Sequence, residues 1–323
     1  MDEIAKDKKR FAFTLKPGES LGPGLLRVID ALVQSVGDRG AAPTPGQGEA
    51  VHAIRITIKR LRAILRLVRP GIGETIFEQE NARLRKAAHR LSLARVRQVA
   101  RRTLLALSLS NKHEQEAAAT VLAGLEAATD PETSVEQAIR RVASNLQQTR
   151  RNLHRLRIAE TDWNIVEAGL RAVYRQGRRR MMIAFADGAD EAFHKWRIRV
   201  KNLYYELQLL EPVCKKRTER FLSLLKELQE KIGEDHDLVV LKSQLRKAPE
   251  TFGGPDGAEY LVQVIDDKSS KLRRASKLIG KAIFAPSAGR FVHKLGRHWK
   301  VAHKDMALQT DFREERQPAL CAA

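Results

Sequence analysis

A ten-residue pattern occurs twice in this sequence of 323 residues, and it restricts the possible folds more than any other feature. His-Ala-Ile-Arg-Ile-Thr-Ile-Lys-Arg-Leu at residues 52–61 aligns with His-Lys-Trp-Arg-Ile-Arg-Val-Lys-Asn-Leu at residues 194–203, which lie 142 positions later. When the alignment is extended without gaps to Pro70 and Pro212, it contains 8 identities in 19 positions. A repeat at this separation predicts two similar structural units within one chain.

Apolar residues recur at helical spacing through most of the chain, and the alternating patterns of strands are rare, so we predict an all-α fold. The expected helices of the first half are 21–35, 49–68, 75–109, 114–128 and 134–158. Those of the second half are 163–185, 191–210, 215–245, 258–284 and 290–306. Because the second half repeats the order of the first, we predict two pseudo-symmetric antiparallel helical bundles, at 17–160 and 161–308, and a flexible tail at 309–323.

Residues that start and stop helices support several of these boundaries. The expected N-caps are Ser20, Ser134 and Asp162. Pro70 with Gly71 is expected to end the helix that begins near residue 49. The glycine- and proline-rich segment at residues 37–48 predicts a flexible connector, and the sequence Ala-Asp-Gly-Ala-Asp at 186–190 predicts a turn.

The charge of the chain indicates a polyanionic partner. Lys and Arg number 59 against 39 Asp and Glu, so the formal net charge is +20, and 37 of the basic residues are Arg. The planar guanidinium group of arginine can bind two phosphate oxygens with parallel hydrogen bonds. Phosphate-rich ligands are therefore favoured over membrane surfaces.

The first copy of the repeat places its basic residues on one face of a helix. At 100° per residue, four cationic side chains fall within roughly 80° of His52. They are Arg55, Lys59, Arg62 and Arg66. Apolar residues such as Leu61 and Leu65 occupy the opposite face, which predicts burial against a neighbouring helix.

The second copy keeps His194, Arg197 and Lys201 on the equivalent face. Tyr204 and Gln208 replace the last two arginines of the first copy. Because its charge is thinner, we expect the first half to dominate the binding of an anion.

A second basic stripe is predicted in the next helix of the first half. On one straight helix, five cationic residues would lie within about 60° of one another, and they are Arg83, Lys86, Arg90, Arg97 and Arg101. Residues 51–102 contain 14 Lys or Arg and 3 acidic residues. A solvated face usually mixes both signs, whereas this density repels itself unless a polyanion or counterions relieve it. We interpret it as a polyanion-binding surface, with an ordinary solvated face as the alternative.

The pattern His-x-x-Arg-x-x-x-Lys-Arg-Leu-Arg at residues 52–62, repeated in part from residue 194, resembles the CHAD family, the conserved histidine α-helical domain. Further similarity lies in Tyr-Arg-Gln-Gly-Arg at 174–178, in Tyr-Glu at 205–206, and in Ile-Gly at 232–233 followed by His-Asp-Leu at 236–238. The resemblance covers nearly the whole chain.

The resemblance implies two pseudo-symmetric bundles whose histidine-bearing helices face a central basic groove or pore. It also implies the binding of inorganic polyphosphate and association with polyphosphate granules and their proteins. The sequence departs from the family pattern at Asn202 and Tyr204, which stand where Arg is common, and at His236, which precedes Asp237 in place of Arg. Val96 stands where the first half should have the matching Asp. These departures weaken the contribution expected from the second half.

The stripes, the second copy and the matched segment at 174–178 together give a predicted set of polyphosphate-binding residues. The set is His52, Arg55, Lys59, Arg60, Arg62, Arg66, Arg83, Lys86, Arg90, Arg97, Arg101, Arg175, Arg178, His194, Arg197 and Lys201. Most of the arginines are expected to make bidentate phosphate contacts, and the lysines to act as point charges.

The two histidines of the repeat suggest a dependence on pH. His52 and His194 can donate a hydrogen bond to phosphate, and a bound anion favours the protonated imidazole, whereas nearby arginines favour the neutral form in the empty protein. The hypothesis is stronger binding at mildly acidic pH. The alternative is a structural histidine packed between helices.

We expect no catalytic activity, no cofactor and no metal site. Phosphoryl transfer needs carboxylates that hold magnesium beside the basic residues, and the densest basic segment offers only Glu74, Glu78 and Glu80, near a predicted loop. Glu234 and Asp237 can share a helix face, but local salt bridging is the simpler interpretation. The C-terminal histidines, which are His293, His298 and His303, do not form a compact zinc-ligand set.

Nucleic acid is the main alternative ligand. Aromatic residues make up only 5% of the chain, and Trp196 falls on the apolar side of its helix, so few rings are available to stack on bases. Sequence-independent contacts to the RNA or DNA backbone stay possible. A scaffold that recruits acidic proteins is a further alternative.

The remaining composition favours a cytoplasmic location. Cys214 and Cys321 are far apart and indicate no disulfide framework. The N-terminal residues lack the apolar stretch of a signal peptide, and no run of residues reaches membrane-spanning length, so we expect no membrane association.

Overall fold

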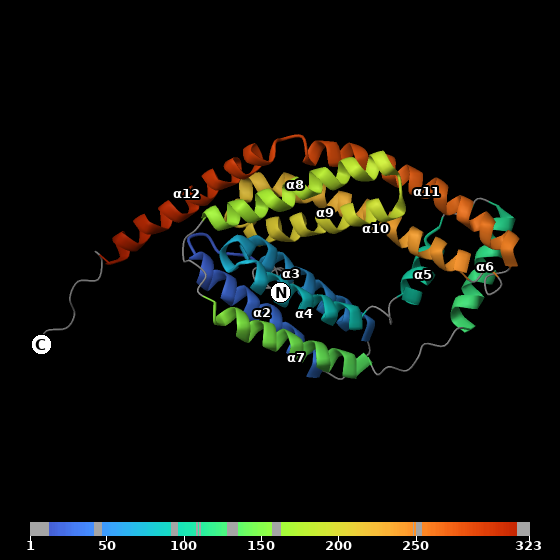
Figure 1. The fold of residues 1–323 in the computed structure, drawn as a ribbon, viewed down its shortest axis with the longest axis horizontal. Helices are drawn as coiled ribbons and strands as arrows, with labels where there is room; N and C mark the ends of the chain where they lie inside the picture. Colours follow the sequence, from blue (N-terminus) through green and yellow to red (C-terminus); the bar gives the residue numbers. More distant parts are fainter. Residues whose placement is uncertain are drawn as a thin grey trace, which may run out of the picture.

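The computed structural model describes residues 13–41, 47–91, 96–107, 109, 111–127, 135–156, 163–247, 249 and 254–314. Within these residues the chain forms eleven helices and no strand, which confirms the predicted all-α class (Figure 1). The helices are α2 (Leu21–Ala41), α3 (Gln47–Ile72), α4 (Glu74–Arg90), α5 (Val96–Leu105), α6 (Lys112–Ala127), α7 (Val135–His154), α8 (Trp163–Asp187), α9 (Asp190–Leu210), α10 (Lys215–Lys247), α11 (Gly254–Ile283) and α12 (Ala288–Glu314).

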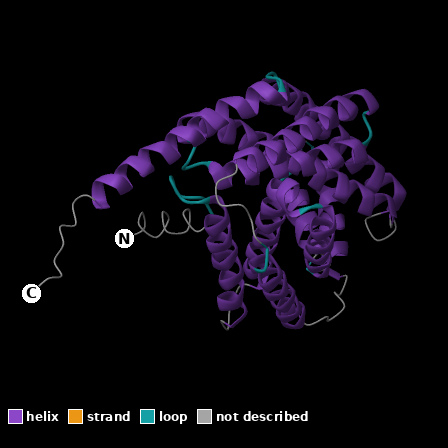
Figure 2. Cartoon of the chain, turned by 60° about the vertical axis from the view of Figure 1, so that its left-hand side comes forward, coloured by secondary structure: helices purple, strands orange, loops and turns teal. Residues whose placement is uncertain are grey.

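The helices pack in two large groups that share an interface (Figure 1, Figure 2). Helices α2, α3, α4 and α7 form one group, and α8, α9, α10 and α12 lie over it. Helix α3 is central because it packs against α2 and α4 on its own side and against α8 and α9 across the interface. Helices α5 and α6 pack instead against α10 and α11. None of the described helices combines the length and apolarity that a membrane-spanning segment requires.

Two hydrophobic cores hold these helices together. The larger core joins buried side chains of α2, α3, α4 and α7 to those of α8, α9, α10 and α12. The smaller core joins Leu104 of α5 and Val121 of α6 to Leu241 of α10 and Leu261 of α11. Both cores cross the predicted division at residue 160. Helices of the two predicted halves therefore share both cores. The division into two bundles and their pseudo-symmetry stay predictions.

The predicted single helix over residues 75–109 is wrong. Helix α4 ends at Arg90, and α5 begins at Val96 after residues 92–95, which lie outside the described part of the chain. The reason is packing: Leu84 and Ala87 of α4 belong to the larger core, whereas Leu104 belongs to the smaller one. One straight helix cannot reach both cores, so tertiary packing overrides the continuous apolar pattern.

Several helix ends also differ from the predictions. Helix α2 continues to Ala41, into the predicted connector. Pro70 lies inside α3, which ends at Ile72. The glycine that ends α3 is Gly73, whose φ of 82° an L side chain rarely adopts, and not Gly71. At the other end of the chain, α12 continues to Glu314, so residues 309–314 of the predicted tail are helical, and 315–323 lie outside the described residues.

The predicted turn between α8 and α9 is present. Gly188 separates the two helices with φ of 76°. The N-caps expected at Ser134 and Asp162 lie outside the described residues, whereas Ser20 directly precedes α2. The prediction of a turn from the sequence at 186–190 is therefore confirmed at Gly188.

The crossing of α3 and α8 depends on a glycine. A Cβ atom at Gly169 of α8 would stand only 2.1 Å from the backbone carbonyl oxygen of Leu67 in α3. Real non-bonded atoms do not approach so closely, and a backbone atom cannot rotate away as a side chain can. The close approach therefore requires a residue without a side chain.

We predict that Gly169→Ala lowers the free energy of unfolding by about 1–3 kcal/mol or more, because the two helices must move apart. Gly233 in the middle of α10 is the matched control, since no atom lies within 4 Å of a Cβ added there. Gly233→Ala is expected to be neutral or to stabilise by up to about 1 kcal/mol through helix propensity. Urea denaturation measures both variants. Equal effects of the two substitutions would contradict this account of the crossing.

Candidate functional site

Six arginines from four helices lie close together where α3 packs against α8 and α9. We call them the arginine cluster: Arg62, Arg66 and Arg69 of α3, Arg85 of α4, Arg180 of α8 and Arg199 of α9. The charges of Arg85 and Arg199 lower the pKa of Arg62, and the charges of Arg180 and Arg69 lower the pKa of Arg199. These groups are therefore near enough to repel one another. The cluster joins residues from both copies of the repeat.

Polar contacts orient part of the arginine cluster. Arg62 donates from Nε to Oδ1 of Asn81 at 2.8 Å, and Arg66 donates from Nη1 to the Arg62 carbonyl oxygen at 2.8 Å. Arg69 forms a two-point ion pair with Glu74, with both distances 2.6 Å, and stacks over Phe77 at 4.6 Å. The contacts with Asn81 and Glu74 hold Arg62 and Arg69 on the side of α3 that faces α4.

Most of the cluster has no acidic partner. Among the described residues, only Arg69 of the six forms an ion pair. Burial lowers the pKa of Arg62, and the nearby Arg85 and Arg199 lower it further. Burial, then Arg62, lowers the pKa of Arg66 in the same way. Because a guanidinium group stays protonated at neutral pH, the cluster keeps a positive charge that an approaching anion would stabilise.

The carboxyl group that faces the cluster does not neutralise it. Glu206 of α9 is fully buried, and neither of its oxygens has a hydrogen-bond partner among the described residues. Burial raises the pKa of Glu206 well above its ordinary value, although the charges of Arg66 and Arg199 act in the opposite direction. A buried carboxyl group without hydrogen bonds favours the neutral form.

His194, Arg197 and Lys201 of the second copy form a separate group near α10. The ring of His194 stacks on that of His236 in α10, with centroids 4.8 Å apart. Both rings line a pocket of about 210 Å³ between α9 and α10. Burial, then the charges of His236, Arg197 and Lys201, lowers the pKa of His194. The neutral imidazole is therefore favoured in the empty protein, as the sequence predicted.

Asp237 of α10 links this second group to α5 through an ion pair with Arg102. Its carboxylate lies 3.3 Å from Arg102 and 3.4 Å from Nδ1 of His236. Burial acts to raise its pKa, but the hydrogen bond from His236 and the charges of Arg197 and Arg102 lower it overall. Asp237 therefore offsets part of the positive charge around His194.

The structure distributes the other predicted residues of α3 over more than one surface. His52 is exposed near the start of α3, and Lys59 is half-buried. Arg55 donates from Nη1 to the carbonyl oxygen of Ala88 in α4 at 3.2 Å. Arg60 lies away from Arg62, since it covers the ring of Phe13 at 4.5 Å and lies near Tyr204 and Tyr205. Arg60 is thus held by aromatic side chains and not by the arginine cluster.

The second predicted stripe is not a single surface. Arg83 pairs with the buried Glu80 at 3.3 Å, and Lys86 and Arg90 are exposed on α4. Arg101 is exposed on α5, beyond the break between the two helices. The side chain of Arg97 lies outside the described residues. The prediction that these residues align along one straight helix is corrected, because α4 and α5 pack against different cores.

Arg175 and Arg178 lie on another face of the molecule. They line an open pocket of about 710 Å³ along α8, together with Arg171 and Arg179. Arg180 of the arginine cluster is five residues from Arg175, which places the two side chains about 140° apart around the helix. The predicted residues of α8 therefore do not join those of α3.

Sequence reasoning missed four members of the arginine cluster. Arg69 and Arg85 lie in the dense basic segment, and Arg180 ends a run of three arginines at 178–180, so composition alone could have found them. Arg199 stands at the repeat position of Thr57, off the predicted stripe. Only the packing of α9 on α3 reveals its role, because a single-helix projection cannot show which faces of two helices meet.

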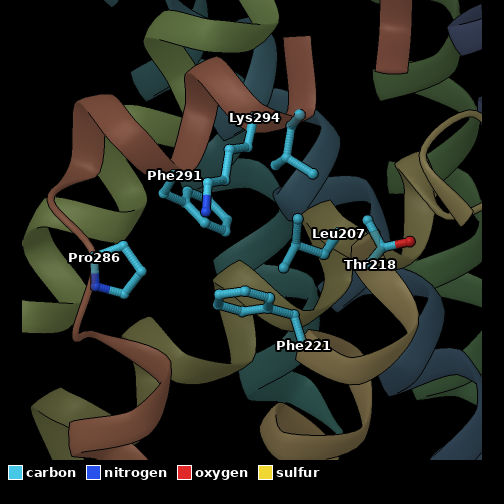
Figure 3. A pocket seen from close by; sticks show the side chains of 7 residues that line it. Leu207, Thr218, Phe221, Pro286, Phe291 and Lys294 are labelled. Carbon is cyan, nitrogen blue, oxygen red and sulfur yellow. The ribbon is translucent and has the colours of Figure 1, made fainter. Parts of the chain in front are cut away.

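The apolar pocket between α9, α10 and α12 is a poor candidate for an anion site. Figure 3 shows Leu207, Phe221 and Phe291 pointing into it, with Pro286 and Lys294 at its border. Its volume of about 60 Å³ accommodates little more than one or two water molecules. Because Phe221, Pro286 and Lys294 are only half-buried, it is a small apolar recess at the surface of the larger core.

The acidic residues considered for metal or acid/base chemistry are engaged elsewhere. Glu234 pairs with Lys268 at 2.8 Å, and Asp237 pairs with Arg102. In the described part of the chain, no group of three or more potential ligands is arranged to hold a metal ion. His303 of α12 stacks on Trp299 with centroids 4.3 Å apart.

The fold and the site define an all-α protein with a repeated histidine-bearing helix and a cluster of arginines at the interface of its two copies. The CHAD domain family model matches residues 33–246, and the chain belongs to this family. No curated protein matches the sequence. Among solved structures, the CHAD domain from the plant Ricinus communis is similar, with 18% sequence identity and a TM-score of 0.54. The similarity covers 88% of this chain and 94% of that one. The CHAD family is associated in general with the binding of polyphosphate or triphosphate.

The state of Glu206 gives a prediction about stability and pH. A carboxyl group whose pKa is raised by folding stabilises less as pH rises above its unfolded pKa, which is about 4.3, because the folded state keeps a proton that the unfolded state has lost. Glu206→Gln removes this titration while keeping the shape. We expect the variant to gain stability relative to the native chain as pH rises from about 5 to 7, measured by urea denaturation. If Glu206 were an ionised partner of Arg66, the difference in stability between the variant and the native chain would stay constant over this range, because the group would be ionised in both the folded and the unfolded state.

Proposed function

We propose that this protein binds inorganic polyphosphate at the arginine cluster and does not catalyse a reaction. The observation that carries the proposal is the convergence of arginines from α3, α4, α8 and α9 with only one ion pair among them in the described residues. Membership of the CHAD family supports the choice of polyphosphate over other anions.

The chemistry of polyphosphate fits such a cluster. The chain is flexible, carries one negative charge per internal phosphate and has no bases to recognise, so binding needs closely spaced cations and little else. Each guanidinium group can contact two phosphate oxygens. Release of counterions adds to the free energy of association, so the affinity should fall steeply with salt.

Both copies of the repeat contribute to the proposed site. Arg199 of the second half lies close enough to Arg62 and Arg66 of the first to lower the pKa of both, and Arg180 of the second half acts on Arg199 in the same way. His194, Arg197 and Lys201 provide a further cationic group beside α10. We therefore propose a larger share for the second half than the replaced arginines of its stripe indicate.

Nucleic acid is the less favoured ligand. Trp196 is fully buried, and Tyr204 packs edge-on against Tyr205 beside Arg60, so these rings are held by packing and not presented to bases. Competition separates the two ligands. Long polyphosphate should displace RNA at matched phosphate concentration and salt, and failure to do so would favour a nucleic-acid-binding protein.

The proposal of binding without catalysis rests on the carboxylates near the basic segment. Glu74 is held by Arg69, and Glu80 by Arg83 and by Asn152 at 2.7 Å, so two of the three candidates to hold magnesium are already paired. Release of phosphate from labelled polyphosphate by the pure protein with magnesium would contradict this part of the proposal. We further propose a cytoplasmic, polyphosphate-granule-associated location, with granule proteins as partners.

Removal of charge from the cluster tests the proposal. We expect Arg62→Gln, Arg66→Gln and Arg199→Gln together to weaken polyphosphate binding by about 100-fold, at roughly 1 kcal/mol for each lost contact. The slope of log affinity against log salt should fall by about two, since three cations no longer displace counterions. Fluorescence anisotropy with labelled polyphosphate at several salt concentrations measures both quantities.

The matched control removes the same charge elsewhere. Arg220, Lys226 and Arg246 are exposed on α10, and none forms an ion pair among the described residues. Arg220→Gln, Lys226→Gln and Arg246→Gln together should change the affinity by less than about fivefold, through net charge alone. An equal loss in both triple variants would show that binding depends on total charge and not on the cluster.

The histidine hypothesis gives a pH dependence. Because the pKa of His194 is lowered in the empty protein by burial and by His236, Arg197 and Lys201, a bound phosphate chain would raise it, and binding would take up a proton. The affinity should therefore increase as pH falls from 8 to about 5.5. His52→Gln with His194→Gln should flatten this profile. An identical profile in the double variant would show that both histidines are structural.

A further inference from the structure

The open pocket along α8 combines arginines with the start of another helix. Arg171, Arg175, Arg178 and Arg179 line it on one side, and Ala288 and Gly289, in the first turn of α12, line it on the other. The first backbone N–H groups of a helix have no partner within the helix and favour negative charge. The pocket thus presents two kinds of anion-binding group to one space of about 710 Å³.

The positive charge of the α8 pocket is mostly unbalanced. Arg171 pairs with Glu167 one turn earlier in α8. Arg175, Arg178 and Arg179 are exposed and form no ion pair among the described residues. Three guanidinium groups on little more than one turn of helix repel one another, so a bound anion would relieve the repulsion.

Tyr174 connects α8 to the start of α12 beside the pocket. Its hydroxyl group lies 3.0 Å from the carbonyl oxygen of Ile283 and 2.9 Å from that of Pro286, so its one hydrogen is shared between two acceptors in the connection between α11 and α12. Its ring stacks on Phe291 of α12 with centroids 4.4 Å apart. The start of α12 is therefore positioned beside the arginines before any ligand binds, which reduces the entropic cost of binding.

The α8 pocket is separate from the arginine cluster. The two sites use different faces of α8, because Arg175 and Arg179 lie about 140° and 100° from Arg180 around the helix. The diameter of a helix with its side chains is about 10–12 Å, which a triphosphate ion cannot span. One short phosphate chain can therefore occupy only one of the two sites.

We propose that the α8 pocket is a second site for condensed phosphates, so that one protein molecule bridges two polyphosphate chains. The proposal rests on polyphosphate binding at the arginine cluster and adds a second, independent site. Two sites on different faces turn a binding protein into a cross-linker, and a long chain with several proteins bound becomes part of a network.

Titration of the native chain with triphosphate counts the sites, and we expect two per molecule. Arg175→Gln with Arg179→Gln should leave one site, and the cluster variant Arg62→Gln, Arg66→Gln and Arg199→Gln should leave the other. With long polyphosphate, the native chain should form networks that scatter light. Either variant should still bind the long chain but lose the scattering. Arg220→Gln with Lys226→Gln is the matched control and should keep both properties.

The outcomes separate this inference from the proposed function. No binding of triphosphate or long polyphosphate by the native chain would contradict both. A single triphosphate site that only the cluster variant removes would overturn the second site and leave the proposed function intact. If Arg175→Gln with Arg179→Gln lowered RNA binding but left triphosphate binding unchanged, the pocket would be a nucleic-acid site and the inference would be wrong.

Discussion

Helix α3 packs against α8 and α9, and this packing determines both the shape of the larger core and the place of the arginine cluster. It buries the apolar faces of the two repeated helices in one core, and Gly169 lets the backbones of α3 and α8 approach closely. The same packing brings Arg62 and Arg66 close enough to Arg199 for its charge to lower the pKa of both. Burial of apolar surface, which stabilises the fold, therefore also forces cations together. The site is a direct consequence of how the two copies of the repeat meet.

Repulsion among the arginines of the cluster lowers the stability of the protein when no anion is bound. The structure could have relieved it with carboxylates, but Glu206 is buried without hydrogen bonds and favours the neutral form. The contrast with Arg273 is instructive, since its guanidinium group pairs with Asp190 at 2.6 Å and Asp235 at 2.9 Å, and its pKa is raised by these contacts even though burial acts against them. The chain thus neutralises this half-buried arginine with two carboxylates. The arginine cluster is left positive, as expected of a surface that binds an anion from solution.

Much of the fold follows from the sequence, whereas the site follows only in part. Helical periodicity predicted the all-α class and most of the helices, and the repeat led to the CHAD family, because periodicity and repeated motifs are visible in the sequence itself. The break between α4 and α5 was missed because the apolar residues on either side enter different cores. Arg62 and Arg66 were found from the stripe on α3, but Arg199 was not, since its position matters only once α9 is packed on α3. Contacts between helices decide which charges meet, and no single-helix pattern contains them.

If polyphosphate binds at the arginine cluster, the position of a bound phosphate chain will show it. A crystal structure of the protein with a short polyphosphate should show phosphate oxygens within hydrogen-bond distance of Arg62, Arg66 and Arg199. The side chains of these residues should turn toward the ligand with little movement of α3 and α9. Phosphate groups bound only at other surfaces, with the cluster unoccupied at saturating ligand, would contradict the account.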